Sequence, residues 1–332
     1  MTADRRVARR ELSSESVSRD TGSSPAPAAA PASPITRGPA LLAVDGSAPS
    51  EAAARMALDL AERRGARVHA LTVVDTRPAP LPPPMSLAFS LAGAAYGEEL
   101  HEKQQRQVRE ALSEMLHRPI DWPARVALGT PSHAILEEAR RLGAGLVLLG
   151  LRSHHVIERA LNDESTLNVM RAAPCPVLGV TRADTGLPRR VLVGVDFSRA
   201  SLTAARAAQS LVADGGTLVL AYVPPLEMHV PDDGERVIHE LGVPAAFSWF
   251  TRELGAGPGA TVEQVVLPRD PGRSVAELLL GHAEGAQIDL IALGSHRHGR
   301  VERWMLGSVT SDVARDGGRS LLAVPPHDPA AP

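Results

Sequence analysis

The sequence predicts an α/β protein with two consecutive domains, each a doubly wound parallel sheet of the Rossmann-like type. Two observations lead to this fold class. Short apolar runs alternate along the chain with segments whose apolar residues recur at helical spacing, as in parallel sheets whose strands are connected by helices. The whole order of segments then occurs a second time, displaced by 140 positions between Pro131 and Pro271 and by 151 positions between Asp45 and Asp196.

Composition excludes several classes of protein. The 332 residues carry a formal net charge of −3 and only 3% aromatic residues, so no basic field or base-stacking surface attracts nucleic acid or an anionic membrane. No apolar run approaches the roughly 18 residues of a membrane span, and the N-terminus lacks the apolar core of a signal peptide, so we expect a cytoplasmic protein. The single cysteine, Cys175, excludes an intrachain disulfide and is expected to be a small buried residue, with a redox role as the alternative.

Residues 1–37 are expected to form a disordered tail. They hold paired arginines, several serines and a Pro/Ala run over 24–34, and nothing in them repeats at the spacing of a helix or a strand. A basic arm for nucleic acid is the alternative, but several acidic residues dilute its charge. The two domains are expected over residues 38–184 and 188–328.

The first domain opens with a strand expected over 40–44, followed by a helix and a second strand over 67–74. The helix presents small and apolar residues on one face, at i, i+3, i+4, i+7 and i+8 counted from Ala53, and Gly65 ends it. A proline-rich loop over 75–84 comes next.

The rest of the first domain alternates helices and strands. The expected segments are a long amphipathic helix over 86–118, a strand over 125–128, a helix over 132–142, a strand over 146–149, a helix over 166–172 and a strand over 177–180. The run at 146–149 is wholly apolar, which is typical of a strand buried on both faces of a parallel sheet.

The second domain repeats this plan. Strands are expected at the matching positions, 191–196, 217–223, 288–294 and 321–324, and an apolar helical stripe follows Pro271. Residues 224–258 are expected to form the counterpart of the long helix and to cover the cleft or an interface. Packing is the expected role of the aromatic residues in that helix, Trp249 and Phe250.

Sheets of this type bind ligands beyond the carboxyl ends of their strands, where the strand order reverses. The residues at that place are Asp45 and Asp196 after the first strand of each domain, and Gly150 and Gly294 after the fourth. Either aspartate could instead cap the helix that follows it, which needs no ligand.

The segment after Gly294 predicts an anion site. Gly307 and Ser308 immediately precede a helix expected over 309–315, so backbone N–H groups and a hydroxyl can approach an anion closely. Three arginines and one glutamate give residues 294–310 a formal charge of +2; the arginines are Arg297, Arg300 and Arg303. This stretch is therefore a candidate polyphosphate site.

The corresponding stretch of the first domain has Asp163 and Glu164 in place of the glycine and serine. Two arginines and three acidic residues give residues 150–166 a formal charge of −1. One carboxylate about 4 Å from a phosphate charge costs roughly 4 kcal/mol at an effective dielectric constant near 20. We therefore expect the first domain to serve as a structural partner and not to hold ATP in this way.

Together these segments resemble a tandem universal stress protein over residues 39–326. The resemblance rests on Val-Asp-Gly-Ser and Val-Asp-Phe-Ser after the first strands, Gly-Thr-Pro at 129–131, Ala-Pro-Cys-Pro-Val at 173–177, and the Gly-x2-Gly-x9-Gly-Ser signature of the family's ATP-binding branch. The sequence departs from that signature at its second glycine, which is Arg297 here. An arginine at this place either crowds the phosphates or binds one of them through two hydrogen bonds.

The resemblance implies a fold like that of the adenine-nucleotide alpha-hydrolases, adenine-nucleotide binding in a cleft and a role in stress survival. We expect the second domain to bind ATP, together with Mg²⁺, and the protein to act as a regulator. The resemblance also implies pairing through the last strand, either as a homo-oligomer or between the two domains of one chain. Asp196 and the backbone of Val223 would contact the adenosine, and Gly294 the ribose. The phosphates would lie against Arg297, Gly307, Ser308 and Val309.

Two other functions stay open at this point: a dimeric scaffold that binds no nucleotide, with Arg297 filling the cleft, and a weak ATPase. No catalytic residue is assigned, because the sequence contains no defensible Ser/His/Asp or Cys/His arrangement. Histidines in the two equivalent loops suggest a metal, but no carboxylate or cysteine stands at useful spacing, so we expect ordinary exposed residues. These histidines are His154, His155, His296 and His298.

Overall fold

The computed structural model describes residues 35, 37–75, 97–151, 163–181, 186–225, 233–257, 259–295, 306–316 and 318–326. Most of the predicted tail (1–34), almost all of the predicted proline-rich loop and the first part of the helix predicted over 86–118 lie outside the described residues.

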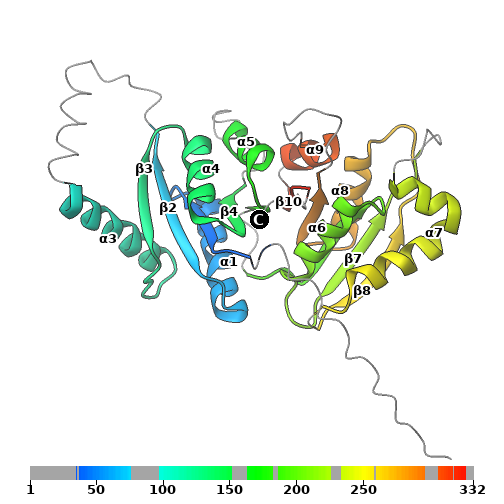
Figure 1. The fold of residues 1–332 in the computed structure, drawn as a ribbon, viewed down its shortest axis with the longest axis horizontal. Helices are drawn as coiled ribbons and strands as arrows, with labels where there is room; N and C mark the ends of the chain where they lie inside the picture. The colour runs from blue at the N-terminus through cyan, green and yellow to red at the C-terminus, as the bar shows by residue number, and fades with distance from the viewer. Residues whose placement is uncertain are drawn as a thin grey trace, which may run out of the picture. The chain divides into compact units, whose positions relative to one another are not determined.

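The N-terminal half comprises alternating strands and helices, which Figure 1 colours from blue to green. In chain order they are β1 (Ala40–Val44), α1 (Ala48–Arg64), β2 (Val68–Val74), α3 (Gly97–Met115), β3 (Ala124–Leu128), α4 (Pro131–Leu142), β4 (Leu146–Gly150), α5 (Asp163–Ala172) and β5 (Val177–Val180).

The C-terminal half repeats the same order, which the sequence predicts except for the strand β8. Its elements are β6 (Arg190–Val195), α6 (Arg199–Gln209), β7 (Thr217–Tyr222), α7 (Asp233–Leu254), β8 (Thr261–Val266), α8 (Val275–Gly285), β9 (Leu290–Gly294), α9 (Ser308–Asp316) and β10 (Ser320–Val324).

In the described part of the chain the strands form one ten-stranded sheet, in the order β3-β2-β1-β4-β5-β10-β9-β6-β7-β8. Within each half all pairs are parallel, and the strand order reverses between the first strand and the fourth, so both halves have the predicted doubly wound topology. The halves join through β5 and β10, which pair antiparallel with Leu322 opposite Leu178.

This pairing of the last strands lies within one chain. It is reinforced by a buried hydrogen bond of 2.9 Å from the Thr181 N–H to the Ser320 hydroxyl. Near the linker, the Arg64 guanidinium donates to the Val212 carbonyl at 2.7 Å and pairs with Asp214 at 2.9 Å. The structure thus has the intramolecular form of the predicted pairing; association with a second copy stays a prediction.

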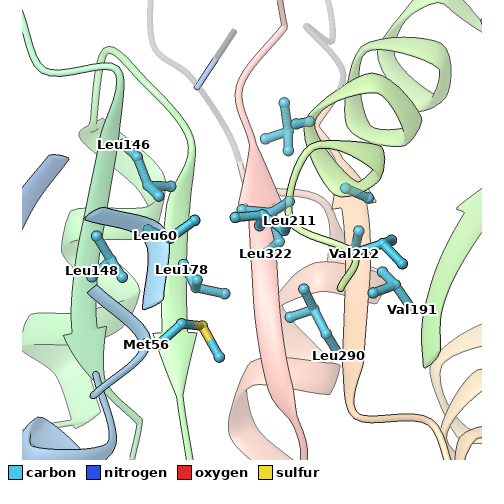
Figure 2. Packing of buried hydrophobic residues seen from close by; sticks show 14 of the residues in the cluster. Met56, Leu60, Leu146, Leu148, Leu178, Val191, Leu211, Val212, Leu290 and Leu322 are labelled. Carbon is cyan, nitrogen blue, oxygen red and sulfur yellow. The ribbon is translucent and has the colours of Figure 1, made fainter. Parts of the chain in front are cut away.

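The core consists of two apolar layers, one on each face of the sheet. One layer contains side chains of α1, α3, α6 and α7, and the other contains side chains of α4, α5, α8 and α9. Figure 2 shows Leu146, Leu148 and Leu178 meeting Met56 and Leu60 of α1. The four apolar residues of β4 at 146–149 are buried, which confirms the expectation of a strand covered on both faces.

The first helix of each half begins with a serine cap. The Ser47 Oγ accepts a hydrogen bond from the Ser50 N–H at 3.4 Å, and the Ser198 Oγ accepts one from the Ser201 N–H at 3.2 Å. Gly65 ends α1 with φ of 66°, the left-handed conformation that favours glycine. These caps fix where each helix starts relative to the strand before it.

Two features of the C-terminal half differ from the sequence expectation. The helix predicted over 224–258 is interrupted, because Gly242 has φ of 74° and ψ of 160° inside α7. Pro244, two residues later, cannot donate a backbone hydrogen bond, and this favours a kink there. The sequence analysis did not predict the strand β8. This strand lies at the edge of the sheet and is largely exposed, so its sequence, Thr-Val-Glu-Gln-Val-Val, contains no apolar run that would indicate a buried strand.

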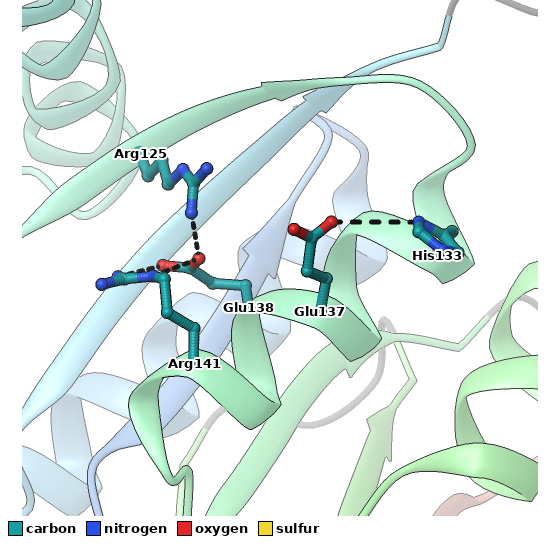
Figure 3. Close-up of polar contacts among 5 residues, drawn as sticks. All are labelled: Arg125, His133, Glu137, Glu138 and Arg141. Atoms are coloured by element: carbon teal, nitrogen blue, oxygen red, sulfur yellow. Dashed lines mark hydrogen bonds and ion pairs between the residues drawn. The ribbon is translucent and has the colours of Figure 1, made fainter.

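Glu138 of α4 is a buried carboxylate, only 4% exposed, held between two arginines (Figure 3). Arg125 of β3 donates to its Oε2 at 2.5 Å, and Arg141 donates to both oxygens at 2.8 and 2.6 Å. The pKa of Glu138 is lowered mainly by the hydrogen bonds from Arg141. Burial acts in the opposite direction and raises the pKa, whereas the charge and hydrogen bond of Arg125 lower it further. The ion pair with Arg125 ties α4 to the edge strand β3.

Replacing Glu138 with glutamine is expected to lower the free energy of unfolding by about 1–3 kcal/mol near neutral pH, because charged hydrogen bonds are lost. The pKa of Glu138 in the folded protein lies below its unfolded value of about 4.3, so the contribution is present above that pH and disappears as the pH falls through the folded-state pKa. Urea unfolding of both proteins between about pH 7 and about pH 3 measures the difference.

Glu137→Gln is the matched control, since Glu137 is the next residue, lies 3.9 Å from His133 and has a side chain that is 69% exposed. It should change the free energy of unfolding by less than about 0.5 kcal/mol. A stability loss in Glu138→Gln that stayed constant over the pH range would contradict the assigned role of the carboxylate.

Candidate functional site

The strand-end residues predicted to contact a nucleotide lie together at the carboxyl edge of the C-terminal half. Asp196 follows β6, Val223 follows β7, and Gly294 is the last residue of β9. Because β6 pairs in parallel with both β7 and β9, these three strand ends adjoin. The helix α9 runs back from this edge to β10, so its first residues, Ser308 and Val309, lie on the same side of the sheet.

The carboxylate of Asp196 takes part in a capping network. Its Oδ1 accepts hydrogen bonds from the Ser198 N–H at 3.0 Å and from the Ser198 hydroxyl at 2.6 Å. In the N-terminal half, Asp45 accepts the Ser47 N–H at 2.9 Å in the same way. The N-caps of the two helices are Ser47 and Ser198 and not the aspartates, whose carboxylates instead accept the N–H of the cap serine. Nucleotide contact by Asp196 stays a prediction.

Phe197 is a structural residue of this edge that sequence analysis missed. It has φ of 63° where its counterpart Gly46 has φ of 76°, so a bulky side chain occupies a conformation that favours glycine. Its ring is 1% exposed and lies 5.0 Å from the rings of both Tyr222 and Phe247. The signal in the sequence was a phenylalanine in Val-Asp-Phe-Ser at the place where the first half has glycine.

Gly294 lies where a side chain has no room. A Cβ there would come within 2.5 Å of the Ala200 carbonyl oxygen in the first turn of α6. At the counterpart Gly150, a Cβ would lie 2.7 Å from the Ser50 backbone nitrogen in α1. Close packing of a helix on the strand end therefore accounts for both glycines, and contact of Gly294 with a ribose stays a prediction.

The start of α9 has the geometry of an anion site. The Ser311 N–H donates to the Gly307 carbonyl at 2.9 Å, which places Gly307 at the N-cap and leaves the preceding N–H groups without partners inside the helix. Among the described residues, a Cβ on Gly307 would meet only the Thr310 Oγ1, at 4.0 Å. The counterpart helix α5 begins with Asp163 and Glu164 instead.

Several predicted residues lie outside the described residues, and the structure does not test them. They are Arg297, Arg300, Arg303 and the four loop histidines His154, His155, His296 and His298. Among the residues that are described, no group of three or more histidine, cysteine or acidic side chains could hold a metal ion. The effect of Arg297 on a phosphate group stays a prediction.

The N-terminal half contains a pocket of about 250 Å³ at its own carboxyl edge, called the N-terminal pocket below. Its lining includes Asp45, Leu71, Asp75, Ile135, Thr166 and Val169. By strand register, the lining residues Asp45, Val73 and Gly150 are the counterparts of Asp196, Val223 and Gly294. Sequence analysis, which treated this half as a structural partner, did not foresee the pocket, because enclosure depends on how the side chains pack.

Cys175 is buried, and burial raises the pKa of its thiol to about 12. A thiol with that pKa holds almost no thiolate near neutral pH, and the thiolate is the nucleophile. The structure thus agrees with the expected small buried residue.

The two doubly wound halves, each with the carboxyl ends of its parallel strands at one edge, define a tandem α/β protein of Rossmann-like architecture. The sequence model of the universal stress protein family matches residues 37–181 and again residues 188–325. These two matches cover most of the chain, and the protein belongs to the universal stress protein family.

Individual relatives are similar at lower levels. A universal stress protein of Methanocaldococcus jannaschii is 27% identical over 146 residues, which are 43% of this chain and 81% of that protein. The crystal structure of a universal stress protein from Archaeoglobus fulgidus covers 87% of this chain and 98% of its own, with a TM-score of 0.58 and 18% identity, which is a likeness of fold. A universal stress protein crystallised in complex with cAMP covers 44% of this chain and 98% of its own, with a TM-score of 0.30 and 20% identity.

No helix in the described part of the chain is both long enough and apolar enough to cross a membrane.

Proposed function

We propose that this protein binds an adenine nucleotide, ATP in the first place, at the carboxyl edge of its C-terminal half and acts as a cytoplasmic regulator of the stress response. Members of its family bind adenine nucleotides, among them the one crystallised with cAMP. The observation that supports the assignment to this half is the N-cap of α9 at Gly307, where the first N–H groups have no acceptor within the helix and where the first half has acidic residues instead.

The remaining contacts follow from the arrangement of the strand ends. Asp196 and the backbone of Val223 would receive the adenosine, with Gly294 below the ribose, because these residues adjoin at the ends of three neighbouring strands. The phosphates would lie at Gly307, Ser308 and Val309, with Arg297 beside them. Mg²⁺ would accompany the triphosphate and neutralise part of its charge.

Saturating Mg-ATP is expected to stabilise the protein by about 2.7 kcal/mol when its concentration is 100 times the dissociation constant, because it binds the folded state alone. The measurement is a thermal melting curve with increasing Mg-ATP. The variant Gly307→Glu should lose the shift, because it places a carboxylate where the phosphates would lie. Its own fold should persist, since no described atom lies closer than 4.0 Å to a Cβ at this position and an acidic residue at a helix N-terminus is favourable.

Gly307→Ala is the control at the same position. A methyl group fits there, so this variant should keep most of the shift while its own stability falls by up to about 1 kcal/mol through the weaker N-cap. An unsubstituted protein whose melting curve does not move in saturating Mg-ATP would refute the proposal.

A scaffold that binds no nucleotide is the second candidate. It is favoured by the capping network of Asp196 and by the steric role of Gly294, since both explain these residues without a ligand. Identification of the small molecules released by acid from protein isolated from cells separates the two functions, because only the first leaves an adenine nucleotide in the extract.

A further inference from the structure

We propose that two copies of this protein associate through their β8 strands, which pair antiparallel about Gln264 and join the two sheets into one. This inference does not depend on the proposed function, because β8 is an outer strand of the sheet and none of its residues belongs to the proposed nucleotide site.

A second copy can extend the sheet only at a strand that has a free side. In the described part of the chain, the last strand of each half is already paired on both sides, since β5 and β10 form the junction between the halves. The strands with a free side there are β3 at one end of the sheet and β8 at the other. Association that extends the sheet therefore has to use β3 or β8.

β8 is the more accessible of these two strands. Four of its six residues are exposed, whereas in β3 only the last residue, Leu128, is exposed. The register of β8 with β7 runs without a bulge from Thr261 to Val266, and the strand contains no proline and no lysine. Bulges, prolines and lysines are devices by which soluble proteins prevent edge strands from pairing with another chain. Since β8 has none of them, it is open to pairing.

The backbone groups that point outward from β8 are those of Val262, Gln264 and Val266. The N–H groups of Thr261 and Leu267 donate to carbonyls on the β7 side at 2.9 and 2.8 Å, so the odd-numbered residues face β7 and the even-numbered residues face away. Among the described residues, no backbone group pairs with the outward-facing groups. Each of these three residues thus offers one donor and one acceptor to a further strand.

β8 is complementary to a second copy of itself. When two β8 strands run antiparallel about a twofold axis at Gln264, Val262 lies opposite Val266 of the second copy, and the two Gln264 residues lie opposite each other. The outward-facing residues then form hydrogen-bonded pairs, and each pair exchanges two N–H···O bonds. A twofold contact of this kind closes on itself, so the product is a dimer.

The side chains also suit this register. Val266 is 45% exposed and would pack beside Val262 of the second copy, a pair of β-branched residues of the kind that stabilises antiparallel strands. The charged residue of β8, Glu263, would lie opposite Val265 of the second copy, and its carboxylate is balanced within its own chain by Arg190 at 3.1 Å. Like charges therefore do not stand directly opposite each other across the axis.

Sedimentation velocity of the full chain at increasing concentration tests the proposal. We expect the unsubstituted protein to change from monomer to dimer as its concentration rises. Gln264→Pro should raise the dissociation constant of the dimer at least about tenfold, because proline removes the N–H at the centre of the interface. This N–H faces away from β7, so the monomer loses no backbone hydrogen bond, and an edge strand accepts proline at such a position.

Gln264→Ala is the matched control. It loses the hydrogen bond of 3.1 Å from the Gln264 side chain to the Thr251 hydroxyl, as the proline variant does, but it keeps the backbone N–H and should dimerise like the unsubstituted protein. Gln264→Lys is the second variant if proline impairs folding. It places two positive charges at the axis, so its dimer should be weaker at low salt and recover as salt is added.

An unsubstituted protein that stays monomeric up to about 100 μM would overturn the proposal, since a dimer with a dissociation constant of about 1 μM would then be almost wholly formed. A Gln264→Pro protein that dimerises as tightly as the unsubstituted protein would overturn it too, because the copies would then associate at another surface. So would species that grow beyond a dimer, because pairing of β8 with β3 of the next copy does not close.

Discussion

Replacing Phe197 with alanine should lower the free energy of unfolding by about 3–5 kcal/mol, which is the usual cost of removing a fully buried aromatic ring. The ring is 1% exposed and contacts the rings of Tyr222, Phe247 and Phe250, with the last at 6.0 Å in an edge-on arrangement. It joins the turn after β6 to β7 and α7. Its loss leaves a cavity between these elements.

Phe197→Gly is the informative second variant. Alanine keeps the cost of a left-handed backbone at φ of 63°, whereas glycine removes it, as the counterpart Gly46 does in the other half. We therefore expect the glycine variant to be about 1 kcal/mol more stable than the alanine variant although its side chain is smaller. Urea unfolding followed by tryptophan fluorescence is suitable, since Trp249 lies 6.3 Å from the Phe250 ring. A loss below about 1 kcal/mol in Phe197→Ala would contradict the role assigned to the ring cluster.

Replacing Gly294 with alanine should destabilise the protein by about 3 kcal/mol even without nucleotide, at the upper end of the cost of overpacking. The added Cβ would lie 2.5 Å from the Ala200 carbonyl oxygen and 2.6 Å from its carbon. Both are backbone atoms in the first turn of α6, so a change of side-chain rotamer cannot relieve the clash. The helix must move away from β9, and Asp196 and its capping network move with it.

Gly285→Ala provides the control, because no described atom lies within 4 Å of a Cβ at the end of α8 and alanine is the better helix former. It should leave stability unchanged or raise it by up to about 1 kcal/mol. A Gly294→Ala protein that unfolds like the unsubstituted protein but no longer responds to Mg-ATP would show that this glycine serves the ligand and not the packing of α6.

Much of the fold was predictable because the signals are local. The apolar run at 146–149 predicted a strand buried on both faces, and the spacing from Ala53 predicted the buried face of α1; both are confirmed. The duplicated order of segments predicted two doubly wound halves, which the sheet order confirms. The strand β8 was not predictable in this way, since its exposed edge position needs no apolar pattern.

The candidate site was predictable in part. That Asp196, Val223 and Gly294 meet at one edge follows from parallel topology alone, and the structure brings them together there. That Gly294 faces backbone atoms of α6 depends on how closely a helix packs on a strand, which no spacing in the sequence reports. The same holds for the N-terminal pocket, whose lining comes from five separate segments of the chain.

The sequence by itself determined the duplicated α/β plan and the membership of the family. It also determined the asymmetry between a glycine-serine turn in one half and two acidic residues in the other. These features depend on motifs and on hydrophobic periodicity, which involve residues close together in the chain. Tertiary structure decided the antiparallel junction of β5 with β10, the left-handed backbone of Phe197 within its aromatic cluster and the pocket in the N-terminal half. These features arise from contacts between residues far apart in the chain, where packing and exclusion of volume act without leaving a local pattern.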